Sequence, residues 1–546
     1  MKTQTLKINE NDNVIVALED LNAGQMVIHQ GVPYQILENI PAKHKFFSKD
    51  MEAGHEIIMY GMLVGKLQCP VQKGRRMSVE NTKHAAGAYS FRGVKPFWKA
   101  PDVSKFKDTK FYGYHRSNGE VGTANHWLFI PTVFCENRNL DIIKETLHNE
   151  LGYAVGDKYK DYTQQLIQAI DLGTDLNDVD FHSDRSSKKS RFFKNIDGIK
   201  FLNHSGGCGG SRADAASLSK LLAAYANHPN VAGVTLLSLG CQHLQVKDFL
   251  HDLKLANPVF DKPLVIHEQQ QSHSEAELIR LAIRDTLRGL IAVNKTGRSA
   301  AGLDKLCIGV KCGGSDGFSG ISANPVVGHC ADLVVALGGK VLAAEFPEFC
   351  GVEQHLIDRA VDKATADKFI KLMSEYDALA HKLGSGFYMN PSPGNINDGL
   401  ITDAIKSAGA AKKAGSSPIV DVLDYTEPAT KSGLSLVCTP GNDVEATTGK
   451  TAAGATIILF TTGLGTPTGN PICPVVKIAT NSALALRMND IIDIDTGGVI
   501  SGTQSIESLG EALLEYCIKI ASGTEIPKAV ALNQDDFIPW KRGVSL

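Results

Sequence analysis

The stretch LCIGVKCGG, residues 306–314, joins a short apolar run to a turn that contains two glycines. A continuous run of Val, Ile and Leu is typical of a strand buried on both faces of a parallel sheet. The same pattern recurs at residues 231–239, 263–266, 333–337, 419–423, 434–437, 457–460 and 475–478. These runs predict an α/β fold with mostly parallel sheets and flanking helices.

Helical segments alternate with these runs. Ser274 and Glu277 form a capping box, and apolar residues then recur at helical spacing as far as Leu290. A second apolar face extends from Leu140 and stops at Gly152, because glycine commonly ends a helix. We expect both helices to pack against the sheets.

The chain divides into regions of different pattern. Residues 1–86 hold short alternating runs separated by Gly and Pro turns, which predicts a small β module. Residues 87–110 show no periodicity and are interpreted as a linker. Because 546 residues exceed one ordinary core, we expect two larger α/β domains, at residues 111–250 and 251–546.

Composition excludes several classes of partner. The 56 basic and 59 acidic residues give a net charge of −3, which lacks the basic excess of a nucleic-acid-binding protein. Apolar runs fall short of the roughly 18–20 residues that a membrane span requires, and residues 1–11 are polar, unlike a secretory signal. We therefore expect a cytoplasmic protein that acts on a small polar molecule, with neither nucleic acid nor membrane as partner.

Cysteines suggest a metal site. Eleven cysteines, an odd number without an export signal, argue for free thiols and against a disulfide framework. Cys208, Cys241 and Cys312 each lie in a glycine-bearing turn after an apolar run. Thiolates presented by such turns could converge on one ion.

Carboxylates follow other strands of the predicted sheet. Asp316 comes soon after Cys312, and Glu345 and Glu348 follow the apolar residues 341–344. His243 follows Cys241 in the same way, and residues 267–269, HEQ, follow the run at 263–266. Open α/β sheets bind ligands outside the carboxyl ends of their strands, so these groups are expected to share one crevice. Asp316 and Glu345 are therefore alternative oxygen ligands for a metal.

Residues 203–212, NHSGGCGGSR, form the densest chemical constellation in the chain. His204 could act as a base or a ligand, or could be a structural histidine. The backbone N–H groups of this loop, such as that of Gly209, and the guanidinium of Arg212 could bind a carboxylate at the start of the following helix.

Two further segments have more than one interpretation. Residues 43–46, KHKF, place His44 between two lysines, a pattern that is more often an exposed basic loop than a site. Residues 313–317, GGSDG, match the nucleophile elbow of a serine hydrolase, with Ser315 as nucleophile and His329 or His355 as base. Glycine-rich turns produce this match often, so the metal enzyme is favoured.

Many ordered motifs resemble the altronate/galactarate dehydratases, sugar-acid dehydratases with an N-terminal SAF-type β module and a larger catalytic region. The resemblance extends over nearly the whole chain. The matching stretches are residues 12–14, 43–46, 58–61, 113–116, 119–123, 204, 207–209, 311–316, 345–353, 390–395, 461–467 and 477–481. One departure is Ser78 to Asn81, where many relatives carry His-x-His-Asn.

The resemblance implies loss of water from a hexonate, such as D-altronate giving 2-keto-3-deoxy-D-gluconate, or from galactarate or another sugar acid. It implies Fe²⁺ or Mn²⁺ as cofactor, with an iron–sulfur cluster as the alternative, and a homo-oligomer. A serine hydrolase and a non-catalytic sugar-acid-binding protein remain the competing classes. The residues assigned on this basis are His204, His44 and Lys45 for proton transfer, Arg212, Gly209, Ser315 and Asn395 for substrate, and Cys208, Cys241, Cys312, Asp316 and Glu345 for metal.

Overall fold

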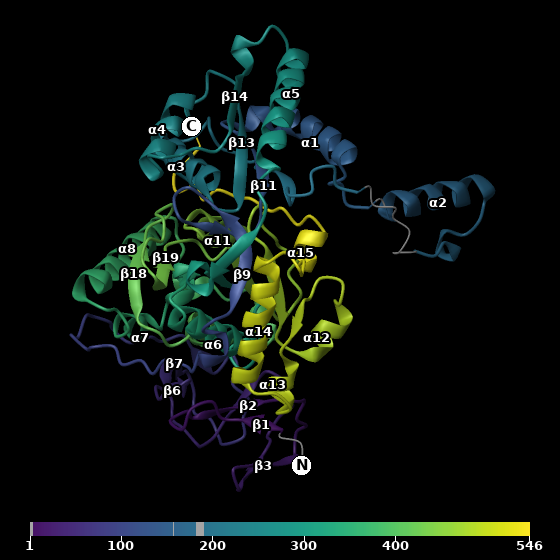
Figure 1. The fold of residues 1–546 in the computed structure, drawn as a ribbon. Helices are drawn as coiled ribbons and strands as arrows, with labels where there is room; N and C mark the ends of the chain where they lie inside the picture. Colours follow the sequence, from purple (N-terminus) through teal and green to yellow (C-terminus); the bar gives the residue numbers. More distant parts are fainter. Residues whose placement is uncertain (1–3, 157, 182–189, 546) are drawn as a thin grey trace.

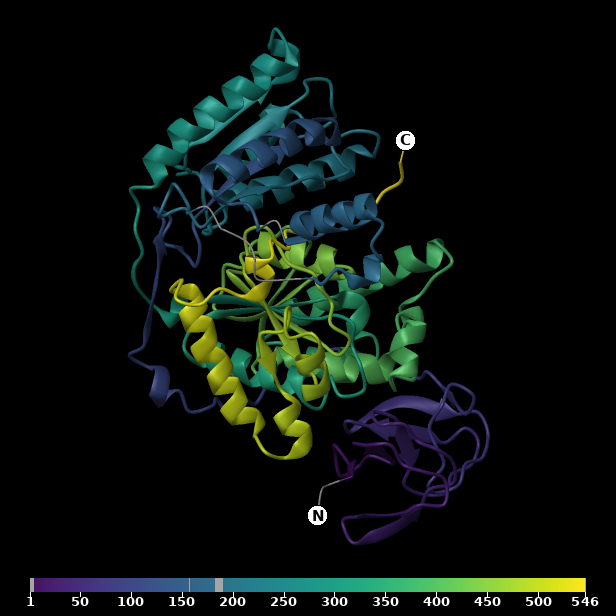
Figure 2. The same ribbon diagram turned by 90° about the vertical axis from the view of Figure 1, so that its right-hand side faces the viewer.

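The computed structural model describes residues 4–156, 158–181 and 190–545. An N-terminal β module, a domain with a four-stranded sheet and a domain with a seven-stranded sheet make up these residues. The seven-stranded domain lies between the other two (Figures 1 and 2). The predicted α/β class with a small β module in front is confirmed.

The N-terminal module consists of short antiparallel strands around a small apolar core that includes Ile15, Ile36 and Phe46. Gly and Pro turns interrupt the chain often enough that no helix forms in residues 4–86. Its strands are β1 (Thr5–Leu6), β2 (Val14–Ala17), β3 (Met26–His29), β4 (Val32–Gln35), β5 (Lys45–Phe47), β6 (Glu56–Met59), β7 (Met62–Leu67) and β8 (Thr82–Lys83).

A four-stranded parallel sheet in the order β12-β11-β13-β14 forms the second domain. Its strands are β11 (His126–Pro131), β12 (Gly198–Phe201), β13 (Val231–Ser238) and β14 (Leu264–Glu268), and its helices are α1 (Asn137–Leu151), α3 (Arg212–Asn227), α4 (Val246–Ala256) and α5 (Glu275–Val293). Ser274 caps α5 by accepting from the Glu277 N–H, and Gly152 is left-handed after α1, as predicted. The capping box is half formed, because the Glu277 carboxylate accepts from the His273 N–H instead of the Ser274 N–H.

The domain boundary expected near residue 250 falls inside α4, and β14 beyond it pairs with β13. A strand cannot leave the sheet that supplies its backbone hydrogen bonds, so the second domain continues through α5. A small antiparallel sheet then joins the domains, built from β9 (Lys110–His115), β10 (Val121–Gly122) and β15 (Ser299–Gly302).

The third domain contains a seven-stranded parallel sheet in the order β18-β19-β17-β16-β20-β21-β22. Its strands are β16 (Cys307–Cys312), β17 (Lys340–Ala344), β18 (Ile419–Leu423), β19 (Gly433–Val437), β20 (Ile457–Thr462), β21 (Val475–Ala479) and β22 (Ile494–Asp495). Along β16, Ile308 and Val310 join one apolar cluster and Cys307 joins another, so the sheet is buried on both faces.

Helices cover both faces of the seven-stranded sheet (Figure 1). The helices of this domain are α6 (Ala323–Ala336), α7 (Glu353–Ile357), α8 (Lys363–Lys382), α9 (Pro393–Asn397), α10 (Asp403–Ala411), α11 (Asp443–Ala452), α12 (Ser482–Arg487), α13 (Gly497–Ser501), α14 (Ile506–Ala521) and α15 (Lys528–Ala531). The run at residues 333–337, predicted as a strand, instead ends α6. A helix buried on all sides gives the same apolar run as a buried strand.

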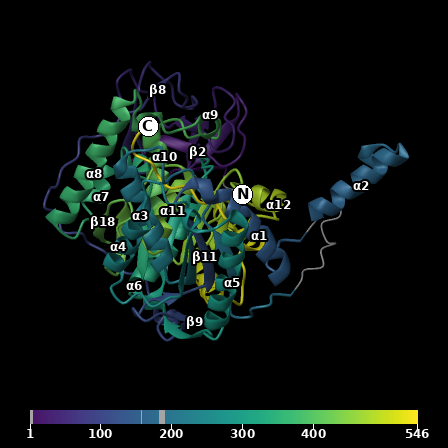
Figure 3. The ribbon, with the colours of Figure 1, turned by 90° about the horizontal axis from the view of Figure 1, so that it is seen from above.

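Helix α2 (Lys158–Leu172) projects away from the body of the molecule (Figures 1 and 3). Several of its apolar side chains, including Ile167 and Ile170, are exposed. Among the described residues, no helix combines the length and the apolar character that crossing a membrane would demand.

Replacement of Gly289 by alanine should destabilise the second domain. Gly233 and Gly289 both pack on the fully buried Trp127 ring, and a Cβ at Gly289 would lie 2.0 Å from a ring atom. We expect a loss of about 1–3 kcal/mol in the free energy of unfolding, since overpacking outweighs the gain in helix propensity. Gly297→Ala, with no neighbour within 4 Å, is the matched control for urea denaturation. Equal midpoints for the two variants would contradict this account.

Candidate active site

The carboxyl ends of neighbouring strands of the seven-stranded sheet form one edge. The strands end at Cys312 in β16, Ala344 in β17, Val437 in β19, Thr462 in β20 and Ala479 in β21. The loops that follow lie close together, because Thr480 Oγ1 donates to Asp316 Oδ2 at 3.1 Å and the Gly313 N–H donates to Thr461 O at 3.0 Å. This edge is where open α/β sheets bind ligands.

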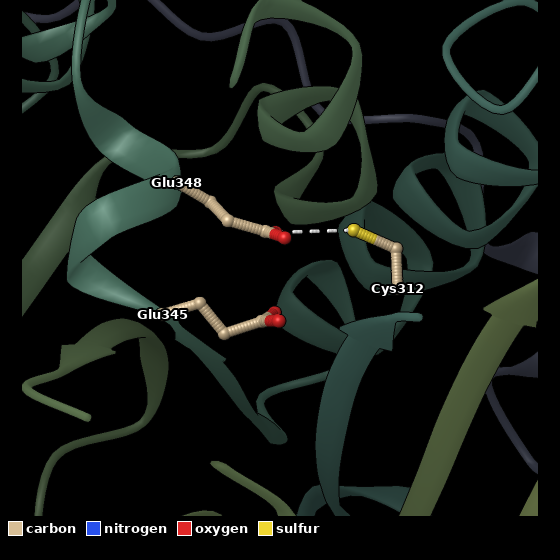
Figure 4. Close-up of side chains that lie close together, drawn as sticks. All are labelled: Cys312, Glu345 and Glu348. Carbon is tan, nitrogen blue, oxygen red and sulfur yellow. Dashed lines mark hydrogen bonds between the residues drawn. The ribbon is translucent and has the colours of Figure 1, made fainter. Parts of the chain in front are cut away.

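Cys312, Glu345 and Glu348 converge at this edge, and we call them the acidic cluster (Figure 4). Their ligand atoms all lie within 4.8 Å of one another, and all three residues are buried. Cys312 Sγ is 3.2 Å from Glu348 Oε2. Glu345 has a left-handed φ of 80°, an uncommon backbone for a residue other than glycine.

Lysines compensate the charge of the acidic cluster. Lys413 Nζ lies 3.0 Å from Glu345 Oε2, 3.1 Å from Glu348 Oε2 and 3.0 Å from Cys312 Sγ. Lys311 pairs with Glu345 and, at 3.0 Å, with Asp443. Lys311 and Lys413 are both almost completely buried, so each requires these partners.

The protonation states follow from these contacts. Burial raises the pKa of Glu348, but nearby ammonium groups, led by that of Lys413, outweigh it and hold the pKa well below its usual range. Burial and the charge of Glu348 raise the pKa of the Cys312 thiol to about 12. Cys312 is therefore a thiol that donates to Glu348 and accepts from Lys413.

The acidic cluster fits a divalent metal ion by its donors. One sulfur and two carboxylates suit a transition metal such as iron or manganese, and they lie close enough to share it. The Lys413 ammonium contacts the same three donors, so an ion could bind only when this ammonium moves away. The thiol proton would leave on binding.

Of the three cysteines expected to converge, only Cys312 lies in the acidic cluster. Cys208 and Cys241 lie in loops of the second domain, which contact each other where the His243 N–H donates to Gly207 O at 3.0 Å. Within the described part of the chain, these two join no group of three metal-type side chains. The cluster therefore lacks the thiolates that an iron–sulfur centre uses.

The N-terminal module inserts one loop into the carboxyl edge. Lys43 Nζ lies 3.1 Å from Asp316 Oδ2 and 2.9 Å from Asp398 Oδ1. His44 Nε2 is 2.9 Å from Asn397 O, and Lys45 Nζ donates to Gly399 O at 2.7 Å. Residues 43–45 thus pack against the third domain and do not form an exposed basic loop.

Burial changes the acid–base character of this loop. It lowers the pKa of the fully buried Lys45 to about 7, although the charge of Asp316 acts in the opposite direction. Burial also lowers the pKa of His44, whose Nδ1 has no hydrogen-bond partner among the residues described. An amine that is about half neutral near pH 7 therefore lies near Asp316, and a neutral imidazole precedes it in the chain. Such groups are suited to proton transfer.

His204 lies in the second domain, and both of its ring nitrogens are occupied. Nε2 is 2.8 Å from Pro131 O, and Nδ1 accepts from the Gly206 N–H at 3.1 Å. Burial lowers the pKa of His204 to about 4. The ring therefore orders the glycine loop around left-handed Gly207 and Gly209.

Arg212 begins α3 and lines a groove of about 720 Å³ together with His243, Asp248 and Asp252. A smaller cavity of about 60 Å³ next to it is lined by Cys208 and by Trp540 of the C-terminal segment. This segment returns to the second domain, where the Gly543 N–H donates to Asp214 Oδ1 at 3.0 Å. The structure thus groups the residues around 204–212 in the second domain, and none of them is a member of the acidic cluster.

Ser315 and Asn395 meet through the backbone, since Asn395 Nδ2 donates to Ser315 O at 2.8 Å. Among the described residues, no hydrogen bond joins the Ser315 hydroxyl to a histidine, so the elbow lacks its base. His329 and His355 instead line a separate groove beside the N-terminal module. Glu80 is exposed and joins no metal-type group in the described residues.

Sequence reasoning missed the buried lysines of the carboxyl edge. Lys311 stands inside an otherwise apolar strand, a signal that could have marked it. Lys413 follows α10 with no pattern that distinguishes it from a surface lysine. Two more buried lysines, Lys450 and Lys477, have pKa values lowered to about 7 by burial.

Replacement of Lys413 by methionine tests the proposed exchange between ammonium and metal. Without Mn²⁺, the variant should lose up to about 3–5 kcal/mol of stability. The buried carboxylates lose one compensating charge and keep Lys311 beside Glu345 and Lys406 3.5 Å from Glu348. Mn²⁺ should then raise its melting temperature more than that of the unchanged protein. The exposed Lys382→Met variant is the control. If calorimetry shows the same Mn²⁺ response in all three proteins, the acidic cluster does not hold the ion.

Three family models together match most of the chain. Residues 3–85 match the altronate/galactarate dehydratase SAF domain, residues 113–294 the D-galactarate dehydratase/altronate hydrolase second domain, and residues 303–545 the D-galactarate/altronate dehydratase C-terminal domain. These limits agree with the module, the four-stranded domain through α5, and the seven-stranded domain.

Curated relatives extend over the same length. The chain is 32% identical to altronate dehydratase of Escherichia coli K12 over 100% of both chains, and 30% identical to altronate dehydratase of Bacillus subtilis 168 over 99% of both. It is 30% identical to the L-threo-forming galactarate dehydratase of E. coli K12, over 95% of this chain and 92% of the relative. The chain therefore belongs to the altronate/galactarate dehydratase family of sugar-acid hydro-lyases.

Proposed function

We propose that this enzyme removes water from a hexonate, with D-altronate as its substrate and 2-keto-3-deoxy-D-gluconate as product. The observation that carries the proposal is that two features meet at the carboxyl edge, on the segment that follows β16. Cys312 belongs to the metal-type donor set, and Asp316 lies against the module loop that contains Lys45, whose pKa is lowered. The two altronate dehydratases with full-length similarity favour altronate over galactarate.

The reaction places specific demands on this edge. The proton on the substrate's second carbon lies next to a carboxylate, so its removal builds negative charge in a group that is already anionic. A divalent ion held by Cys312, Glu345 and Glu348, which we propose to be Fe²⁺ or Mn²⁺, would supply electrostatic stabilisation of that charge. The hydroxyl on the third carbon must receive a proton as it leaves.

Residues of the chain can supply the base and the contacts that orient the substrate. Lys45, neutral in a large fraction near pH 7, is the proposed base, and His44 with its unpartnered Nδ1 is the alternative. Lys43 would orient the substrate carboxylate, since its side chain keeps 20% exposure at the edge while paired with Asp316. We assign Arg212 and the Gly209 N–H to substrate on the side of the second domain, and His204 to ordering that loop.

Substrate reaches this edge from the solvent side of two ion pairs. Asp443 and Asp398 keep 29% and 28% of their side-chain exposure, whereas Glu345 and Asp316 keep none. The partly exposed groups therefore mark the entrance, and the buried ones mark its floor. The expectation of a cytoplasmic homo-oligomer stays a prediction.

The first test is a product assay. Protein purified without oxygen is incubated with D-altronate, galactarate and other hexonates, with and without Fe²⁺, and 2-keto-3-deoxy acid is measured. We expect product from D-altronate that depends on metal and that persists in the Ser315→Ala variant. Binding of hexonates without product would favour a sensor, whereas activity that survives chelation but not Ser315→Ala would favour a hydrolase.

The second test is the pH dependence of Lys45→Met. A base must be unprotonated, so kcat/KM should rise with pH through about 7 in the unchanged enzyme, following the lowered pKa of Lys45. The variant should lose about 10²–10⁴-fold in kcat/KM together with this ascending limb. Lys49→Met, an exposed change in the same module, is the control. If the ascending limb of the kcat/KM profile persisted in Lys45→Met, another buried group and not Lys45 would be the base.

A further inference from the structure

A groove separate from the carboxyl edge lies where the N-terminal module meets the third domain. Its volume is about 640 Å³, and Tyr60 of the module forms one wall. Helix α6 contributes His329 and Asp332, and the segments after α7 and α10 contribute Arg359 and Lys412. None of these residues belongs to the acidic cluster or to the Lys43–Asp316 pair.

Arg359 carries an unused hydrogen-bonding edge. Its side chain is buried, with 7% exposure. Nε and Nη2 donate to Ser417 O at 3.1 and 2.7 Å, and Nη2 also donates to Ala414 O at 3.2 Å. Nη1 is buried and finds no hydrogen-bond partner in the described part of the chain. A buried guanidinium nitrogen without an acceptor is costly, and a bound oxyanion would supply one.

The charge of the groove is positive. Asp332, the one acidic residue among its lining groups in the described chain, already accepts from the Ser416 N–H and hydroxyl and from the Ser417 N–H. Lys412 is exposed at the rim, with Nζ 5.9 Å from the centre of the Tyr60 ring. Arg359 and Lys412 are thus two cations in a groove with the single Asp332 carboxylate, whose charge acts on Arg359.

The groove is also linked to the acidic cluster by one short turn. Lys412 and Lys413 are successive residues of η8 (Lys412–Ala414). Lys412 lines the groove, whereas Lys413 contacts Cys312 and both glutamates. Arg359 holds the carbonyl of Ala414, the last residue of the same turn. A ligand bound to Arg359 and Lys412 would therefore contact two residues that are attached to η8, the turn that positions Lys413.

We propose that this groove binds a small oxyanion, a phosphate or a carboxylate, and that its occupancy alters the acidic cluster through η8. Arg359 and Lys412 bind the anion, and the module closes the groove with Tyr60. The ligand is thus an effector and not the substrate.

Binding is tested by calorimetric titration of the full chain with inorganic phosphate and, separately, with malonate. The tighter of the two identifies the anion class. Lys412→Ala should bind about tenfold more weakly, because one charge-assisted contact is lost. The exposed Lys382→Ala variant should bind as the unchanged protein does. The proposed site would be contradicted if neither anion gave a measurable heat of binding, or if Lys412→Ala and the unchanged protein bound the anion with equal affinity.

A second variant, Arg359→Lys, keeps the charge but cannot hold the turn and the anion together, so it should also weaken binding. Its melting temperature reports whether it folds, and if it does not, Lys412→Ala decides the question.

The link to the acidic cluster is tested by kinetics and rests on the proposed function. The tighter-binding anion should change kcat/KM for the hexonate by about fivefold or more in the unchanged enzyme but not in Lys412→Ala. Competition at the active site would instead persist in that variant. Anion binding without a kinetic effect would contradict the link to the acidic cluster but not the anion site. An enzyme inactive on every hexonate would contradict the proposed function, and the result of the titrations would still stand.

Discussion

Compensation of buried charge is the constraint on which the carboxyl edge of the seven-stranded sheet depends. Glu345 and Glu348 are buried with Cys312, and the ammonium groups of Lys311 and Lys413 lie against them. Removing Lys311 or Lys413 would leave the buried carboxylates with less compensating charge, at a cost of up to about 3–5 kcal/mol. The edge is therefore held in one arrangement, the condition under which fixed charges act on a reacting group.

The N-terminal module is a structural part of this edge. Lys43 pairs with Asp316 and Asp398, and Lys45 donates to Gly399, so three consecutive module residues reach the third domain. Burial at this junction, and not sequence context, lowers the pKa of Lys45. The same junction forms the groove lined by Arg359 and Lys412, which places a second charged surface one turn from the acidic cluster.

Prediction from sequence succeeded where the signal is local. The capping box at Ser274, the stop at Gly152 and the apolar run of β16 each gave the element that the structure contains. The strand predicted at residues 333–337 was wrong, because a buried helix and a buried strand share the same apolar pattern. The boundary near residue 250 was wrong because the pairing of β14 with β13 is a contact that no local pattern records.

The sequence by itself determined the α/β class, the separate β module, the family, and the choice of Cys312 and Glu345 as groups at strand ends. These depend on periodicity and on motifs within short stretches. Tertiary structure alone decided that Cys208 and Cys241 lie in another domain, and that Glu348 and Lys413 complete the acidic cluster. Such groups meet only because parallel strands bring distant loops to one edge, and their protonation depends on burial and partners that exist only once the chain has folded.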